Sequence, residues 1–391
     1  MKKYIYLDYA ATTPIDENVI KLINKTNTLF YGNPGSLHES GRLAKAQIEK
    51  SREEISNHLN TSPDEIIFTG SGTESDNLAI LGIAHAHKQH GKHIIISTIE
   101  HKAVLESALR LKDEGFEVSF APVDKNGILD IGSFKKLLQK DTILVSIMYA
   151  NNEIGTIQPI KEISEILRPI KQKTGYPLFH TDACQAAGVL SLNVNDLGVD
   201  LLTINGSKIY GPKGVGCLYV KKGINLEPQI LGGGQEKNKR SGTENISLIV
   251  GFAKALTIAT RKQESENIRL KQLQNYLIDK IQKTIPKAYL NGHITKRLPN
   301  NINFSFSGIE GEAMILLLDQ AKIYCSTGSA CSSSDLSPSH VLLATGLALE
   351  LAHGSLRITL GRKTTKKDLD TMVDELAKII NFLRKISTIK V

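Results

Sequence analysis

The chain has few of the residues that mark several common protein classes. Its four cysteines, Cys184, Cys217, Cys325 and Cys331, include no Cys-x-x-Cys pair, so neither a zinc site nor a disulfide framework is indicated. No apolar run approaches the length of a membrane span, and Asp8 stands where a signal peptide would continue its apolar core. These features predict a cytoplasmic protein with free thiols.

Basic residues exceed acidic ones, but they are not concentrated in one place. Lys and Arg number 48 against 40 Asp and Glu, a net charge of +8, and aromatic residues make up only 5%. The excess is spread in short clusters such as Lys135-Lys136 and Lys366-Lys367. This pattern supports direct nucleic-acid binding only weakly and fits a solvated surface better.

The middle of the chain alternates short apolar runs with longer amphipathic segments. Strands are predicted over 65–69, 93–97, 117–120, 142–146, 177–180, 201–204 and 215–220. Helices are predicted from about 73, 101 and 130 and over 160–171, and an earlier one runs to about 58 from a capping-box pattern at Ser36 and Glu39. The alternation predicts an α/β fold with a mostly parallel, seven-stranded-type sheet flanked by helices.

The character of the sequence changes after Gly232-Gly233-Gly234. A long helix is predicted over 245–284, an alternating strand over 301–306 and a final helix from about 369 to 383. We therefore expect a large domain of residues 15–260. A smaller α+β domain would combine residues 1–14 with 261–391.

Polar residues follow several of these strands, at the sheet edge where such folds bind ligands. The turn 70–75 is glycine-rich and opens a helix, which suits a phosphate, although an ordinary turn capped by Thr73 explains it equally well. Asp182 could hold a pyridinium nitrogen or cap a turn. His101 could stack on a flat cofactor or cap a helix, and Asn152 could bond a ring hydroxyl or form a turn.

Lys208 lies where the strand 201–204 runs into Gly211-Pro212. Desolvation there would lower its pKa and make the amine a nucleophile for a Schiff base, whereas a lysine that simply reaches solvent is the plainer reading. A phosphate turn, an aspartate, a histidine and a lysine at the ends of one sheet together match what pyridoxal phosphate requires.

Motifs along nearly the whole chain strengthen this prediction. They are 6–14, 32–34, 72–75, 100–101, 151–153, Asp182 with Gln185, 208–214, 232–236, 240–243, 328–331 and 354–357. With them the chain resembles the NifS/IscS-type cysteine desulfurases of the class-V aminotransferase family, which are fold-type I pyridoxal-phosphate enzymes.

The resemblance implies a role for each matching residue. Lys208 would form the Schiff base and later move the Cα proton, and His101 would stack on the ring and handle the substrate thiol proton. Gly72 and Thr73 would bind the cofactor phosphate, and Asn205 and Ser207 occupy positions that normally contact it. Asp182 would hold the ring nitrogen and Gln185 the ring hydroxyl side, and Asn152 would also contact the cofactor. Thr243 would reach the phosphate of a neighbouring subunit. Asn33, Asn152 and Arg357 would bind the substrate, with Arg357 clamping its carboxylate.

The implied reaction is removal of sulfur from L-cysteine to give alanine and a persulfide on Cys331. The loop 326–335 around Cys331 is small and polar, as a nucleophile that visits both cofactor and acceptor requires. The resemblance also implies a homodimer that passes sulfur to an acceptor such as an iron–sulfur scaffold or a tRNA-thiolation enzyme. It implies no resident metal, although Cys331 can contact a transferred iron–sulfur cluster. The lack of a long apolar run predicts no membrane partner, and the charge pattern makes direct nucleic-acid binding the weaker hypothesis.

Two positions depart from the family pattern. Asn205 and Ser207 stand where a serine and a histidine are usual near the phosphate, so binding should persist with altered affinity. The histidines between His85 and His93 have a spacing that a transition metal could use, but a solvated helix end explains them better. Other readings are a selenocysteine lyase or aminotransferase of the same fold, and a non-catalytic binding scaffold.

Overall fold

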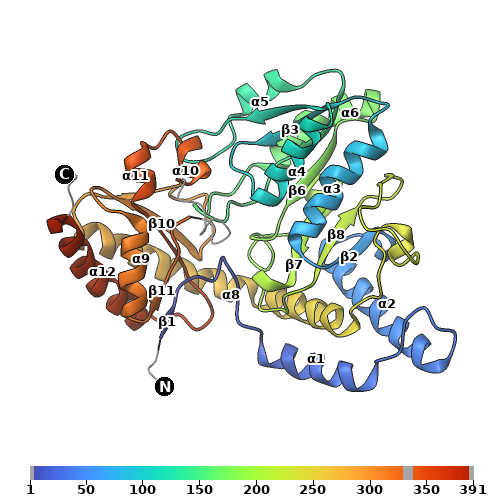
Figure 1. The fold of residues 1–391 in the computed structure, drawn as a ribbon, viewed down its shortest axis with the longest axis horizontal. Helices are drawn as coiled ribbons and strands as arrows, with labels where there is room; N and C mark the ends of the chain where they lie inside the picture. Colours follow the sequence, from blue (N-terminus) through green and yellow to red (C-terminus); the bar gives the residue numbers. More distant parts are fainter. Residues whose placement is uncertain (1–3, 329–337, 387–391) are drawn as a thin grey trace.

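A seven-stranded sheet forms the centre of the molecule (Figure 1). The computed structural model describes residues 4–328 and 338–386. In spatial order the strands are β2 (Ile66–Thr69), β8 (Gly216–Val220), β7 (Leu201–Asn205), β6 (Leu178–Asp182), β5 (Thr142–Ser146), β3 (His93–Ser97) and β4 (Glu117–Ala121). Only β8 runs antiparallel to its neighbours, so the predicted mostly parallel sheet is confirmed.

Helices cover both faces of this sheet because its strands alternate apolar side chains between the two sides. Leu144 and Leu201 pack with α3 and α4, whereas Val145 and Leu202 pack with α2, α6 and α8. The helices are α1 (Glu17–Leu29), α2 (Glu39–Leu59), α3 (Gly72–His87), α4 (Lys102–Asp113), α5 (Ile131–Leu137), α6 (Ile160–Thr174), α7 (Val194–Leu197) and α8 (Ile246–Thr284).

The C-terminal part has its own sheet and core. Its strands are β9 (Ala288–Leu290), β10 (Asn301–Phe306) and β12 (Ser355–Thr359), in the order β12-β10-β9. Its helices are α9 (Gly311–Gln320), α10 (His340–Ala344), α11 (Leu349–His353) and α12 (Lys366–Ile386). The N-terminal β1 (Ile5–Tyr6) pairs in parallel with β11 (Ile323–Tyr324), and Leu7 joins the same core.

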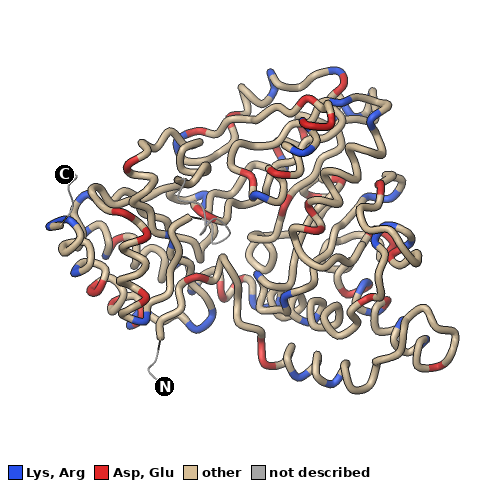
Figure 2. The backbone as a smooth tube through the Cα atoms, in the orientation of Figure 1, with Lys and Arg blue, Asp and Glu red and all other residues tan. Residues whose placement is uncertain are grey.

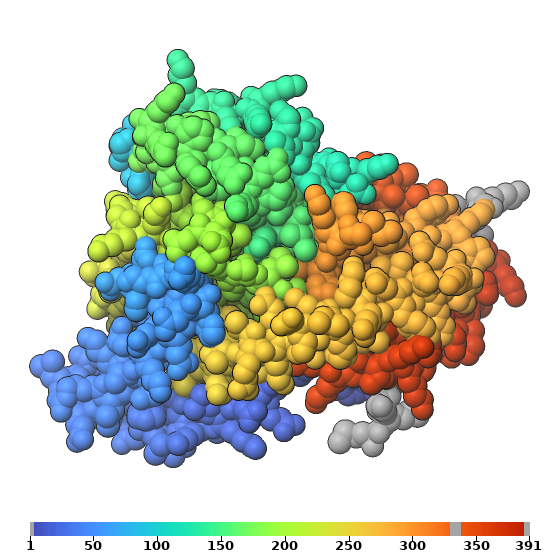
Figure 3. Space-filling model, turned by 180° about the vertical axis from the view of Figure 1, so that it is seen from behind, coloured from blue at the N-terminus to red at the C-terminus, as the bar shows by residue number. Residues whose placement is uncertain are grey.

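Helix α8 links the two parts. Its residues Ile249–Ala259 contribute to the core beside the large sheet, and Leu270–Ile281 contribute to the C-terminal core. Figure 3 shows this helix, in yellow to orange, crossing the back of the molecule. The predicted domain boundary between 260 and 261 falls inside this continuous helix, so the division into 15–260 and 1–14 with 261–391 stays a prediction.

Three local features differ from the sequence-based expectations. Helix α1 was not predicted. The capping box at Ser36 and Glu39 is wrong, because His38 is the N-cap of α2 and its Nδ1 accepts a hydrogen bond from the Gly41 amide at 3.3 Å. Helix α3 begins at Gly72 with Ser71 as its cap, because the Ser71 hydroxyl accepts from the Glu74 amide.

Charged residues are interspersed along the whole backbone (Figure 2). None of the helices within the described ranges combines the length and the apolar character needed to cross a membrane.

Candidate active site

Lys208 lies in a short 3-10 turn directly after β7, against the N-terminal segment. Its Nζ donates a hydrogen bond to the Ala11 carbonyl at 2.6 Å. Thr13 reinforces this contact, since its amide and its hydroxyl both donate to the Ser207 carbonyl at 2.9 Å. The segment that follows β1 and the lysine-bearing turn are therefore held together, although they are almost 200 residues apart in sequence.

The turn between β2 and α3 forms a cradle that faces the end of β7. A Cβ added at Gly72 would lie 2.8 Å from both Asn205 Nδ2 and Cys184 Sγ, so only glycine leaves this space open. The Ser207 hydroxyl donates to Asn205 Oδ1 at 3.2 Å, which directs the amide nitrogen of Asn205 toward the cradle. The free amides of a helix N-terminus, the Thr73 hydroxyl and an amide donor together suit a phosphate.

Asp182 ends β6 and is only 8% exposed. Its Oδ1 accepts a hydrogen bond from the Cys184 amide at 2.8 Å, so the turn-capping role weighed from the sequence is present. Asp182 also lies close to the cradle, because Cys184, whose amide it binds, has its Sγ next to Gly72. Both uses are compatible, since a carboxylate has two oxygens and about four acceptor sites.

A buried polar cluster lies behind Asp182 on the side of α3. His180 Nδ1 is 2.8 Å from Ser146 Oγ, and its Nε2 is 3.1 Å from Thr203 Oγ1 and 3.7 Å from Asp76 Oδ1. Burial lowers the pKa of His180 to about 4, and burial with the nearby Asp182 charge raises the pKa of Asp76. His180 is therefore neutral at physiological pH, and Asp76 favours its protonated form.

Glu100 is a second buried acid beside the site. Its Oε1 accepts hydrogen bonds from the Ser97 hydroxyl and the Met148 amide, and its Oε2 has no hydrogen-bond partner among the described residues. Burial raises its pKa to about 8. The next residue, His101, is the N-cap of α4, and its Nδ1 accepts from the Ala103 amide at 3.1 Å, so the capping role is also present. In the neutral ring this leaves the proton on Nε2.

Arg357 on β12 is 1% exposed and lies between the two parts of the chain. Its Nη2 pairs with Asp8 Oδ1 at 2.8 Å, and its Nη1 donates to the Asn152 carbonyl at 3.3 Å. Its Nε, also buried, has no hydrogen-bond partner in the part of the chain that the structure describes. A buried guanidinium with a donor left over is suited to a small carboxylate.

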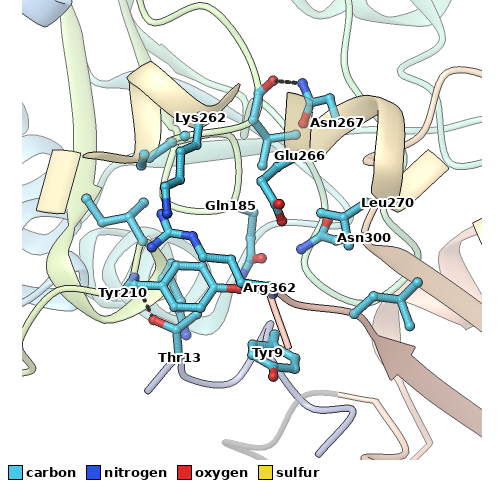
Figure 4. A pocket seen from close by; sticks show the side chains of 17 residues that line it. Tyr9, Thr13, Gln185, Tyr210, Lys262, Glu266, Asn267, Leu270, Asn300 and Arg362 are labelled. Carbon is cyan, nitrogen blue, oxygen red and sulfur yellow. Dashed lines mark hydrogen bonds between the residues drawn. The ribbon is translucent and has the colours of Figure 1, made fainter. Parts of the chain in front are cut away.

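Gln185 lines a cavity of about 60 Å³ together with Lys208 (Figure 4). Its Nε2 donates to the Ala10 carbonyl at 3.0 Å, so the amide is oriented by the N-terminal segment. Tyr210, Lys262, Glu266, Asn300 and Arg362 line the rest of the space. Lys208 and Gln185 therefore line the same cavity, and their roles at a cofactor stay predictions.

Three predicted residues are not brought into this cluster. Asn33 is exposed in the loop between α1 and α2, with its Oδ1 bound to the Gly35 amide at 2.9 Å. Thr243 is exposed in the loop before α8. Cys331 lies outside the described residues, so its place relative to Lys208 is not part of the structure.

The other cysteines and the histidine-rich segment have ordinary surroundings. Burial raises the pKa of the Cys184, Cys217 and Cys325 thiols, which disfavours their thiolates. His87 bonds the Tyr176 hydroxyl and the Asn225 carbonyl, and His85 contacts Glu114. In residues 4–328 and 338–386, no group of three or more His, Cys, Asp or Glu side chains is arranged to hold a metal.

Sequence reasoning missed several contributors to the site. Asp8 lies in the motif 6–14, but its pairing with Arg357 spans 349 residues and no local pattern predicts it. The Ala11 carbonyl, Asp76 and His180 were also missed. A weak signal existed for His180, because it precedes Asp182 by two residues on one strand and so shares its face.

The structure is an α/β fold with a lysine, a glycine-containing cradle and a buried aspartate at the ends of one sheet. Residues 5–372 match the family model of the class-V aminotransferases, so the chain belongs to this family. It is 52% identical over 390 residues to the cysteine desulfurase IscS of Dictyoglomus turgidum, covering 100% of this chain and 98% of that protein.

Solved structures agree with this assignment. A NifS-like protein superposes with a TM-score of 0.91 at 36% identity, covering 97% of this chain and 100% of that one. SspA, solved in complex with cysteine, gives a TM-score of 0.78 at 32% identity over 91% of this chain and 98% of that one. The resemblance to the NifS/IscS type and the fold-type I class are thereby confirmed.

Proposed function

We propose that this protein is a pyridoxal-phosphate-dependent cysteine desulfurase that converts L-cysteine to L-alanine and carries the sulfur as a persulfide on Cys331. The observation that carries the proposal is the open cradle at Gly72, which faces the amide of Asn205 beside Asp182 and the turn of Lys208. Family membership supports the cofactor, since the matching relatives are cysteine desulfurases of the class-V aminotransferase family.

The residues present fit the cofactor. Gly72, Thr73, Asn205 and Ser207 would hold its phosphate, Asp182 its ring nitrogen, Gln185 and Asn152 its hydroxyl side, and His101 its ring face. Bound there, pyridoxal phosphate supplies an electron sink for charge that develops at the substrate Cα.

The protein's own groups would carry the remaining work. Arg357, oriented by Asp8, binds the substrate carboxylate with its unused Nε–H. Lys208 holds and moves the Cα proton at Nζ, and His101 handles the substrate thiol proton. The Cys331 thiolate attacks the substrate sulfur, so an S–S bond forms and the Cβ–S bond breaks. The electron pair of that bond stays with the substrate carbon, which takes up a proton and becomes the methyl group of alanine.

We also propose a homodimer, in which Thr243 and Asn33 serve the site of the neighbouring subunit. Their exposure on the isolated chain supports this, as does their position on adjacent loops. The sulfur acceptor would be a protein such as an iron–sulfur scaffold or a tRNA-thiolation enzyme. A cytoplasmic location remains our prediction, supported by the free thiols of Cys184, Cys217 and Cys325.

The test is release of alanine and sulfide from L-cysteine in the presence of a thiol reductant. We expect Lys208→Ala to lose both products and the yellow absorbance of the bound cofactor. Cys331→Ala should keep the absorbance but release no sulfide, and the matched control Cys325→Ala should retain activity. Undiminished turnover by Cys331→Ala would contradict the persulfide route, and a protein that cannot be reconstituted with pyridoxal phosphate would contradict the proposal as a whole.

A further inference from the structure

The loop 232–243, which ends in Thr243, is tied at two points to the strand and turn that form the phosphate cradle. It contains three consecutive non-glycine residues in the left-handed region, Glu236, Lys237 and Asn238, with φ of 47°, 58° and 65°. Such a conformation persists only where its surroundings hold it. The contacts that hold this loop therefore show what it is connected to.

The first anchor is a buried ion pair. Glu236 and Arg52 are 8% and 5% exposed, and the guanidinium donates to both carboxylate oxygens at 2.7 and 2.8 Å. Glu236 Oε2 also accepts from the Phe68 amide at 2.9 Å, and Arg52 donates to the Ile66 carbonyl at 2.7 Å. Both backbone groups belong to β2, the strand that leads directly into the cradle.

The second anchor joins the loop to the cradle itself. Arg240 donates to both oxygens of Glu74, from Nε at 2.7 Å and from Nη2 at 3.2 Å. Glu74 Oε2 accepts at the same time from the Gly70 amide at 2.8 Å. A single carboxylate thus bridges the turn 70–73, which would bind the phosphate, and Arg240, which stands three residues before Thr243.

The far end of the loop is exposed to solvent. Gly242 and Thr243 are exposed, whereas the neighbouring Ser241 is buried. A groove of about 610 Å³ is lined both by the loop residues 233–237 and by Pro34 and Gly35, next to Asn33. The two predicted site residues that the isolated chain does not bring to Lys208 therefore lie at one common edge.

From these contacts we infer that Glu74 and Arg240 are positioning residues that couple the two cofactor sites of the homodimer, so that filling one site raises the affinity of the other. The inference rests on the proposed function, in which Thr243 reaches the phosphate of the neighbouring subunit. Phosphate bound to the turn 70–73 fixes the Gly70 amide and Glu74. Glu74 in turn fixes Arg240 and the loop that presents Thr243 to the second site. The second phosphate then binds more tightly, because the loop that contacts it is already ordered.

The test is a titration of the cofactor-free homodimer with pyridoxal phosphate, followed by absorbance and read as a binding curve without substrate. If filling the first site raises the affinity of the second roughly five-fold, at the low end of the usual range, the Hill coefficient for two sites is about 1.4. Arg240→Gln should remain dimeric and bind two cofactors per dimer with a Hill coefficient of about 1. Arg110→Gln is the matched control, because Arg110 pairs with Glu114 at 2.8 Å on the exposed face of α4 and should leave the curve unchanged.

Pyridoxal, which has no phosphate, gives a second readout. It should bind the wild-type dimer without cooperativity, because the coupling passes through the phosphate turn. If Arg240→Gln does not fold, Arg240→Lys, which keeps the charge but not the two-point contact, should show a reduced Hill coefficient.

Several results would overturn the coupling. A wild-type dimer with a Hill coefficient of 1, an unchanged curve for Arg240→Gln, or a monomer that binds the cofactor would each do so, and all three leave the desulfurase proposal standing. Failure of the protein to bind pyridoxal phosphate at all would instead overturn the proposed function and, with it, this inference.

Discussion

The substitution Gly72→Ala tests the phosphate cradle directly. The added methyl group would stand 2.8 Å from Asn205 Nδ2 and from Cys184 Sγ, closer than side-chain carbons ordinarily approach such atoms. Asn205 cannot retreat freely, because the Ser207 hydroxyl holds its Oδ1. Overpacking of this kind typically destabilises by about 1–3 kcal/mol.

We expect this strain to fall mainly on cofactor binding, because the phosphate would occupy the space that Asn205 must take. If all of it appears there, the affinity for pyridoxal phosphate falls roughly 5- to 140-fold. The assay is an absorbance titration of cofactor-free protein, with urea unfolding of the same sample to measure any loss of fold stability.

The control is Gly132→Ala, another glycine in the first turn of a helix. Its added Cβ would meet only the Asp130 carboxylate, at 3.3 Å, and α5 lies away from the site. Cofactor affinity should not change in this control. Our placement of the phosphate would be wrong if Gly72→Ala bound pyridoxal phosphate as tightly as wild type while its stability was also unchanged.

Three further predictions concern the charged groups of the site. Arg357→Lys should retain the cofactor absorbance but lower kcat/KM for L-cysteine about 10- to 150-fold, because lysine cannot reproduce the charged hydrogen bonds of the guanidinium; an unchanged KM would argue against carboxylate binding. Glu100 has a pKa of 4.5 when exposed and about 8 in the fold, so the native state keeps its proton longer. The contribution of this proton to the free energy of unfolding is complete below pH 4.5. It falls by on the order of 5 kcal/mol as the pH rises to 8. Relative to Glu100→Gln, wild type should therefore lose stability in urea across that window, and parallel curves would refute the assignment. Asp8→Asn should raise KM for L-cysteine more than it lowers kcat, because Asp8 only orients Arg357; a fall in kcat as large as the rise in KM would contradict this.

The large sheet could be predicted because its strands carry a local signal. Most of them contain a short apolar run followed by turn residues, such as Ile66-Ile67-Phe68 in β2, Ile94-Ile95-Ile96 in β3 and Ile143-Leu144-Val145 in β5. Helix α1 was missed for another reason. Its apolar residues Val19, Ile20, Leu22 and Ile23 lie in the first two turns, and the rest of the helix includes Asn and Thr residues of low helix propensity.

The site could be predicted only in part, for a related reason. Lys208, Asp182 and the turn at Gly72 follow strands of one sheet, so the topology alone gathers them. The pairing of Asp8 with Arg357 depends instead on the N-terminal segment lying beside β12, where Asp8 forms a parallel bridge with Thr359. Likewise, Ser71 rather than Thr73 caps α3 because of a single hydroxyl orientation, which residue preferences do not determine.

The continuity of α8 limits how the two parts of the molecule can move. At 39 residues it is roughly 58 Å long, and one end is embedded in each core. A rotation of the C-terminal part about a flexible linker would require this helix to bend or to leave one of its cores. The distance between Arg357 and Lys208 is therefore fixed by this continuous helix. Discrimination among amino acids should then depend on the length of their side chains, and not on a closing motion that adapts to each of them.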